Sequence, residues 1–191
     1  MRTYVIPIIL ILITSFFAPC LALAQEKTAK ATFAGGCYWC VEEVYDGLKG
    51  VISATSGFAT SRVDAVEIMY EPDKISYQKL LDLFWKNIDP TDSQGQFCDR
   101  GAQYTSAIFY HDEQQKTLAE KSKAEIETIL KQKVVTPILP AAKFTPVAAS
   151  QQDFYKKNKQ QYKQYKIQCG RERRLRELWE GLQRLKPNED R

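Results

Sequence analysis

Apolar residues recur along the chain at two spacings, one typical of strands and the other of helices. Val66, Ile68 and Tyr70 stand at every second position, the spacing of side chains on one face of a strand. Residues 77–88 carry apolar side chains at helical spacing, and Ser76 before them is a residue type that caps helices. The same patterns predict strands at 28–34, 51–59, 65–70, 105–110 and 134–139, helices at 41–48, 112–131 and 151–165, and a loop at 143–150. This order predicts an α+β fold, a two-layer sandwich of helices on a sheet.

The chain from residue 171 onward is rich in arginine, a feature of basic arms that bind nucleic acid. Leu175, Leu178 and Leu182 lie at helical spacing there, however, and glutamates alternate with the arginines. An amphipathic helix is therefore the favoured interpretation. The composition, 44% hydrophobic and 26% charged with a net charge of +4, is typical of a globular protein and indicates neither disorder nor nucleic-acid binding.

The first 24 residues are typical of a secretory signal peptide. Arg2 precedes an apolar run at 4–17, and alanines at 22 and 24 supply the small residues that signal peptidase requires. The run is shorter than the roughly 20 apolar residues of a membrane-spanning helix, and Pro7 interrupts it. We therefore expect export, to a bacterial periplasm, of a single domain at 25–191 with no stable membrane insertion.

Four cysteines remain after the leader: Cys37, Cys40, Cys98 and Cys169. An even number in an exported protein is typical of structural disulfides. Two glycines precede Cys37, which stands where a helix is about to begin, and the free N–H groups of a helix start favour a thiolate. Glutamates at 42 and 43 in the same turn oppose that shift, so the sequence leaves the reactivity of the thiol open.

The spacing of Cys37 and Cys40 suits several kinds of chemistry. It fits a thioredoxin-type dithiol that acts on protein disulfides, and this interpretation stays open as a rival. It also fits half a zinc site, but zinc would need Cys98 and Cys169 as isolated partners, and His111 is the only histidine. We therefore expect no metal, and nothing supports His111 as the base of a papain-like site.

Several segments resemble the peptide methionine sulfoxide reductase A family in the right order. The first is Ala-Gly-Gly-Cys-Tyr-Trp-Cys-Val-Glu at 34–42, where phenylalanine more often stands in place of Tyr38. The second is the central signature of the family, at 87–92 and 95–104. The similarity continues through 138–140 and 153–158 to 169–171, so it covers most of the chain that follows the leader.

The resemblance implies a ferredoxin-like core with irregular C-terminal wrapping and a reductase without metal or bound cofactor. Cys37 would attack the S epimer of methionine sulfoxide in oxidised peptides and proteins, release methionine and become a sulfenic acid. A second thiol would then form a disulfide with it, which an external thioredoxin-like dithiol would reduce. We rank Cys169 first for this resolving role, Cys40 second, and Cys98, as a buried bystander, last. The reductase is expected to be a monomer that repairs oxidised proteins.

The resemblance also assigns a proton donor and a pocket. The family uses a glutamate at the start of its third strand, a place that Asp64 takes here, and an apolar edge would raise the pKa of Asp64 and keep it protonated. Tyr104 is expected to donate a hydrogen bond to the sulfoxide oxygen, with Asp99 as a polar support. Tyr38 and Trp39 would hold the methyl group.

The chain departs from the family between the second and third strands. A glycine-rich loop with a pocket tyrosine is largely absent, Arg62 replaces a histidine, and the acid at 64 is one methylene shorter. Since loops shorten more cheaply than cores, we predict that the fold survives, and since small displacements in active sites cost rate, we predict weakened activity. The second rival is accordingly a weakened relative that binds oxidised methionine without turnover.

Overall fold

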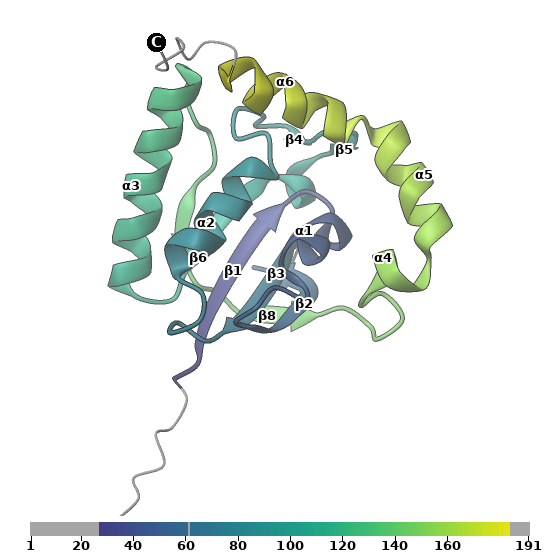
Figure 1. Cartoon of the computed structure of the whole chain (residues 1–191). Coiled ribbons are helices and arrows are strands. Elements are labelled where there is room, and N and C mark those ends of the chain that lie inside the picture. The colour runs from purple at the N-terminus through teal and green to yellow at the C-terminus, as the bar shows by residue number, and fades with distance from the viewer. Residues whose placement is uncertain (1–26, 61, 184–191) are drawn as a thin grey trace, which may run out of the picture.

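A computed structural model of the chain describes residues 27–60 and 62–183. The strands are β1 (Ala29–Gly35), β2 (Val51–Ala59), β3 (Val63–Tyr70), β4 (Gly95–Gln96), β5 (Asp99–Arg100), β6 (Ser106–Tyr110), β7 (Ile138–Pro140) and β8 (Phe144–Pro146). The helices are α1 (Tyr38–Tyr45), α2 (Tyr77–Lys86), α3 (Glu113–Leu130), α4 (Phe154–Lys157), α5 (Lys159–Cys169) and α6 (Arg171–Gln183), with one 3₁₀ turn, η1 (Ala102–Tyr104) (Figure 1). The predicted signal peptide lies outside the described residues. Within them, no helix has the length and apolar character needed to cross a membrane.

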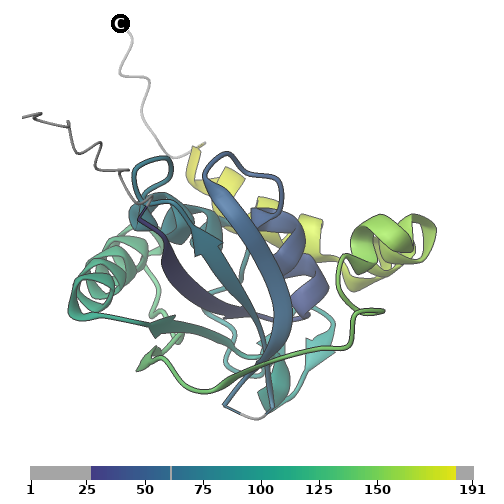
Figure 2. The same ribbon diagram turned by 90° about the horizontal axis from the view of Figure 1, so that it is seen from below.

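Helices and a curled sheet form the mixed α+β fold that the sequence predicts. Six strands make one sheet in the order β7-β6-β1-β3-β2-β8, and helices α1 and α2 lie over one face of it (Figures 1 and 2). Phe33 of β1, Ile68 of β3 and Trp85 of α2 are buried in the core between these layers. The predicted cap is confirmed, because the Ser76 side chain accepts a hydrogen bond from the Lys79 N–H at the start of α2.

The hairpin of β2 and β3 closes where the family loop was expected to be missing. The two strands pair in continuous antiparallel register from Ser53 opposite Met69 to Ala59 opposite Val63, next to the turn. Thr60, in the turn, takes a left-handed conformation with φ of 56°. The prediction that the fold survives the short connection is therefore confirmed for this sheet.

The predicted loop at 143–150 is wrong in part, because β8 pairs with β2 at the edge of the sheet. A β-carbon on Gly57 would lie 2.4 Å from the Phe144 ring and 2.6 Å from the Thr145 carbonyl oxygen. Glycine at 57 thus permits the close approach of β8, a use of this residue within strands. Strand β8 contains a proline and spans three residues, so no alternating pattern announced it.

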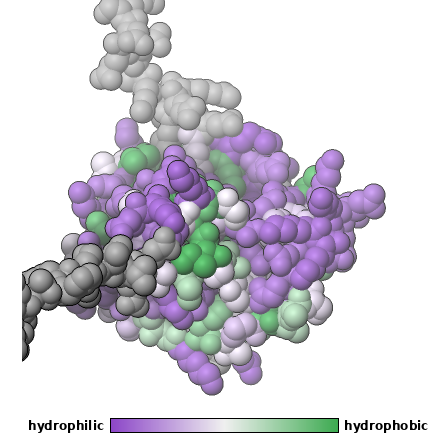
Figure 3. Space-filling model, turned by 60° about the horizontal axis from the view of Figure 1, so that its bottom comes forward, coloured by the Kyte–Doolittle hydropathy of each residue, from purple (hydrophilic) through white to green (hydrophobic). Residues whose placement is uncertain are grey.

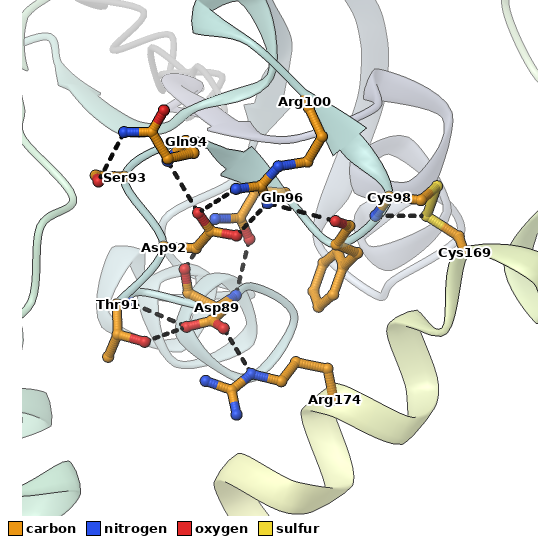
Figure 4. Close-up of polar contacts among 11 residues, drawn as sticks. Asp89, Thr91, Asp92, Ser93, Gln94, Gln96, Cys98, Arg100, Cys169 and Arg174 are labelled. Atoms are coloured by element: carbon orange, nitrogen blue, oxygen red, sulfur yellow. Dashed lines mark hydrogen bonds and ion pairs between the residues drawn. A yellow bond between two sulfur atoms is a disulfide. The ribbon is translucent and has the colours of Figure 1, made fainter.

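Residues 154–183 form three helices, α4, α5 and α6. The single helix predicted at 151–165 is broken at Asn158 into α4 and α5, and Gly170, with φ of 66°, separates α5 from α6. Helix α6 is bound to the central motif by Arg174, whose Nε donates to Asp89 at 2.7 Å (Figure 4). Arg171 of the same helix lies 4.6 Å from the centre of the Phe97 ring. The helix predicted from the leucine spacing is confirmed.

The described surface is mainly polar on the side that Figure 3 shows, with one small central group of hydrophobic side chains and others scattered around it. Large exposed hydrophobic side chains are scattered over different elements, at Ile52, Ile129, Leu139 and Ile167. Isolated apolar residues of this kind are ordinary on protein surfaces and indicate no docking face.

Candidate active site

Cys37 is the N-cap residue of α1, at the position that the glycine turn prepares. Gly36 takes φ of 84°, and a β-carbon there would lie 2.7 Å from the Gln96 side chain, so the turn requires glycine. The backbone N–H of Trp39 at the helix start hydrogen-bonds the Cys37 sulfur and acts to lower the pKa of that thiol. The predicted placement of this cysteine at a helix start is confirmed.

Cys40 lies beside Cys37, and the two free thiols hydrogen-bond each other. Both are buried, with 7% of Cys37 and 3% of Cys40 exposed. The hydrogen bond from Cys37 lowers the pKa of Cys40, helped by the positive charges of Arg171 and Lys166, and the same bond together with burial raises the pKa of Cys37. Two thiols that share a proton in this way lose the first proton more readily than an isolated buried thiol would.

Asp64 supplies a carboxyl group on the helix side of the sheet. It is 5% exposed and accepts a hydrogen bond from the backbone N–H of Tyr38. Burial, with the nearby charge of Asp99, raises the pKa of Asp64 to about 7. The raised pKa keeps a proton available on this carboxyl near neutral pH, as a proton donor requires.

Tyr104 lies close enough to both Asp64 and Cys37 for their charges to affect its pKa. Burial raises the pKa of Tyr104, and the charges of Asp64, Asp99 and Cys37 add to the rise. The phenol consequently stays protonated and can donate a hydrogen bond. Of the side chains that the sequence singled out, Cys37, Cys40, Asp64, Asp99 and Tyr104 are thus brought together.

The predicted aromatic wall is present but is itself packed. The Tyr38 ring meets Trp39 and Phe58 edge to face, at centroid distances of 5.7 and 6.0 Å. Trp39 stacks on Phe154 of α4 at 3.8 Å with an interplanar angle of 12°. One face of the indole is therefore covered by the C-terminal segment, and both Tyr38 and Trp39 are partly exposed.

Cys98, in the turn between β4 and β5, is joined by a disulfide to Cys169 at the end of α5 (Figure 4). The Cα atoms are 4.7 Å apart, and the backbone N–H of Cys98 points at the Cys169 sulfur at 3.2 Å. Cys98 is exposed, so the expectation of a buried bystander is wrong. Cys169, ranked first as the resolving thiol, is held by Cys98, whereas Cys40 lies against Cys37.

One group of metal-ligand side chains occurs among the described residues. The sulfurs of Cys98 and Cys169 and a carboxylate oxygen of Asp99 all lie within 4.8 Å of one another. The two sulfurs are bonded to each other, however, and metals bind thiolates. In this disulfide state the group does not suit a metal.

Sequence reasoning missed the part of the site that comes from the C-terminal helices. Phe154 and Tyr162 are buried against the two free thiols, and Tyr165 packs on the same cluster. The Tyr165 hydroxyl donates to Asp99, and the Tyr162 hydroxyl donates to Glu43 at 2.7 Å. The aromatic spacing within 151–165 was the available signal, but the break at Asn158 sets which rings face the thiols.

Two free thiols at a helix start, beside a buried carboxyl group, are typical of a site for cysteine redox chemistry. The chain is a thiol-based oxidoreductase. A sequence model described as peptide methionine sulfoxide reductase matches residues 29–65 and 59–183. Peptide methionine sulfoxide reductase MsrA of Bacillus licheniformis is 42% identical over 172 residues, which cover 81% of this chain and 95% of that protein. The chain belongs to the peptide methionine sulfoxide reductase family.

Solved structures agree with this assignment. Mxr1 from Saccharomyces cerevisiae in reduced form has a TM-score of 0.66 and 26% identity, over 70% of this chain and 87% of that one. Mxr1 in complex with Trx2 has a TM-score of 0.53 over 67% of this chain and 85% of that one, and at 23% identity it supports the fold alone.

The alignments also bear on the short hairpin. The alignment with the Bacillus licheniformis protein spans 172 residues but takes in only 81% of the 191 residues here, so that relative carries residues with no counterpart in this chain. The two segments that match the family model overlap at 59–65, the turn between β2 and β3. Both observations agree with a loop missing at that turn.

Proposed function

We propose that the protein reduces methionine S-sulfoxide in peptides and proteins to methionine, with Cys37 as the nucleophile and Asp64 as the proton donor. The proposal depends on one observation: a thiol at a helix start and a buried carboxyl group, whose pKa burial raises, meet across the backbone of Tyr38. Family membership and the identity with MsrA proteins support it.

The first half-reaction transfers oxygen from substrate sulfur to protein sulfur. The proton of Cys37 passes along its hydrogen bond to the Cys40 thiolate, and the Cys37 sulfur bonds to the sulfoxide sulfur while Asp64 gives its proton to the sulfoxide oxygen. The hydroxyl group then passes to Cys37, methionine leaves with its sulfur reduced, and Cys37 remains as an oxidised sulfenic acid. Tyr104 is placed to hydrogen-bond the oxygen, and Tyr38 is the ring best placed to contact the methyl group.

We assign the resolving role to Cys40 in place of Cys169. The Cys40 thiolate attacks the sulfenic sulfur of Cys37, a disulfide forms between the two, and hydroxide leaves as water after it takes up a proton. The hydrogen bond between the two thiols at the start of α1 supports this step. Cys169 would first have to leave its disulfide with Cys98.

An external dithiol completes the cycle by reducing the disulfide of Cys37 and Cys40, and we propose a thioredoxin-like protein for this role. The complex of Mxr1 with Trx2 is a precedent in a protein of the same fold. We propose no bound cofactor, because two thiols and one carboxyl group account for each electron and proton in the cycle. The chain is further proposed to work as an exported monomer in a bacterial periplasm, as a single domain at 25–191.

We also propose that the core is ferredoxin-like. The four central strands lie in the order β6-β1-β3-β2, and each is antiparallel to its neighbour. Helix α1 connects β1 to β2, and α2 lies between β3 and β6 in the chain. This arrangement supports two interleaved βαβ units.

The test is a single turnover on a methionine sulfoxide peptide without reductant. The purified chain should release one methionine per protein, lose two hydrogens, and give a disulfide-linked peptide that contains Cys37 and Cys40. Cys40→Ser should stop at the sulfenic acid, which a dimedone probe traps, whereas Cys169→Ser should still form the disulfide. Exchange with a protein disulfide but no reaction with the sulfoxide would establish the thioredoxin-type rival. Binding without a change of mass would establish the weakened relative.

A further inference from the structure

Tyr165 extends from α5 toward the nucleophile. Its ring packs in the cluster of Cys37, Cys40, Phe154 and Tyr162, and it meets the Trp39 ring edge to face at 6.3 Å. Its hydroxyl group hydrogen-bonds the Cys37 thiol and also donates to a carboxylate oxygen of Asp99. The phenol therefore stands between the reacting sulfur and a carboxylate.

The surroundings of Tyr165 keep its proton in place. Burial raises the pKa of Tyr165 far above its usual value, and the charges of Cys37, Cys40 and Asp99 raise it further. Toward Cys37 the hydrogen bond acts in the opposite direction and lowers the pKa of the thiol, against the effects of Cys40 and of burial. A group that remains a donor throughout suits stabilisation of a negative sulfur.

The disulfide of Cys98 and Cys169 lies next in sequence to both Asp99 and the helical turn that carries Tyr165, and it helps to fix the position of Tyr165. Asp99 directly follows Cys98 in the chain, and Tyr165 precedes Cys169 by one turn of α5. The disulfide of Cys98 and Cys169 joins the two elements next to this hydrogen bond. This arrangement restricts movement of the Tyr165 hydroxyl group away from the Cys37 sulfur.

We propose that Tyr165 is a further catalytic residue, which hydrogen-bonds the Cys37 thiolate during attack and which Asp99 and the disulfide hold in position. The role rests on the proposed sulfoxide reduction. No proton is consumed by it: Asp64 supplies the proton for the sulfoxide oxygen, and the hydroxyl proton of Tyr165 shifts its hydrogen bond from Asp99 toward the sulfur while charge is there. Once the sulfenic acid has formed, the hydrogen bond returns to Asp99.

The experiment follows the alkylation of Cys37 by iodoacetamide across pH, resolved by peptide mass spectrometry, on the full chain without substrate. Tyr165→Phe should move the midpoint to higher pH and slow single-turnover methionine release by about tenfold or more, with little change in KM. Tyr155→Phe is the matched control, because that hydroxyl belongs to the same C-terminal segment but bonds to Asp46. It should match the wild-type profile.

A second variant keeps the test decisive if Tyr165→Phe fails to fold. With 3-fluorotyrosine at position 165, the ring is nearly unchanged and the phenol is a stronger donor, so the midpoint should move to lower pH. Midpoints and release rates equal to wild type in the folded variants overturn the proposal. A wild-type chain that releases no methionine overturns the proposed function, whereas the alkylation profile still decides whether Tyr165 stabilises the Cys37 thiolate.

Discussion

The backbone N–H of Tyr38 donates a hydrogen bond to the carboxyl group of Asp64, and this bond connects the start of α1, next to Cys37, to the start of β3. The hydrogen bond favours the ionised carboxylate, yet burial outweighs it and raises the pKa of Asp64 to about 7. The acid of the site thus titrates in the range where the enzyme would work.

Sulfoxide reduction should therefore decline as pH rises above about 7, because Asp64 loses the proton that it must donate. Asp64→Asn should lower the rate on the order of a hundredfold and remove this alkaline decline. The measurement is kcat/KM for a methionine sulfoxide peptide from pH 5 to 9, with the exposed Asp73→Asn as control. An alkaline decline that persists in Asp64→Asn would assign it to another group.

The same carboxyl should make the fold less stable as pH rises. The pKa of Asp64 is higher in the folded chain, about 7, than its usual value of 3.8, so the folded state binds the proton more tightly. Its stabilising contribution is complete below that usual value and is lost as pH rises through about 7, by up to about 4 kcal/mol. In urea denaturation, Asp64→Asn should have a higher free energy of unfolding than wild type at pH 8. The difference between the two proteins should be smaller at pH 4.5. Equal gains at the two pH values would contradict the linkage.

Reduction of the disulfide of Cys98 and Cys169 should destabilise the chain. The bond closes a loop with a sequence separation of 71 residues, for which loop-closure entropy gives about 4 kcal/mol. Thermal melting with dithiothreitol should show a lower midpoint for wild type. A Cys98→Ser, Cys169→Ser double variant should melt low in either condition. A wild-type midpoint that does not respond to reductant would show that the bond adds little.

Asp64→Glu should increase the rate of methionine release. One more methylene carries the carboxyl further from β3 toward the substrate, which restores the reach of the family acid, and active-site displacements of about 1 Å change rates on the order of a hundredfold. Stopped-flow single turnovers of the two proteins provide the comparison, with melting curves to confirm equal folding. A rate for Asp64→Glu at or below wild type would show that the short hairpin already brings Asp64 into reach.

The sequence predicts best where hydrophobic periodicity and caps agree. Residues 51–59 form a strand with those bounds, and α2 begins after Ser76 as expected. Elements that depend on backbone contacts were less accessible. Strand β8 exists because Gly57 admits Phe144 and Thr145, and neither end of that contact produces a pattern in the sequence.

Within the candidate site, the place of Cys37 at a helix start was predictable and the pairing of the cysteines was not. Local spacing placed Cys37 at a helix start, which needs only neighbouring residues. The partner of Cys169 depends on how α5 packs against β5, and four cysteines allow three pairings. Tyr165 was missed for the same reason, since its target lies more than a hundred residues earlier in the chain.

The separation of the sulfurs into two pairs gives each pair its own task. In the proposed cycle, electrons enter and leave through Cys37 and Cys40 alone, so oxidising surroundings can keep the disulfide of Cys98 and Cys169 closed through every turnover. The same oxidant that damages methionine on client proteins would then also maintain the covalent frame of the enzyme that repairs them.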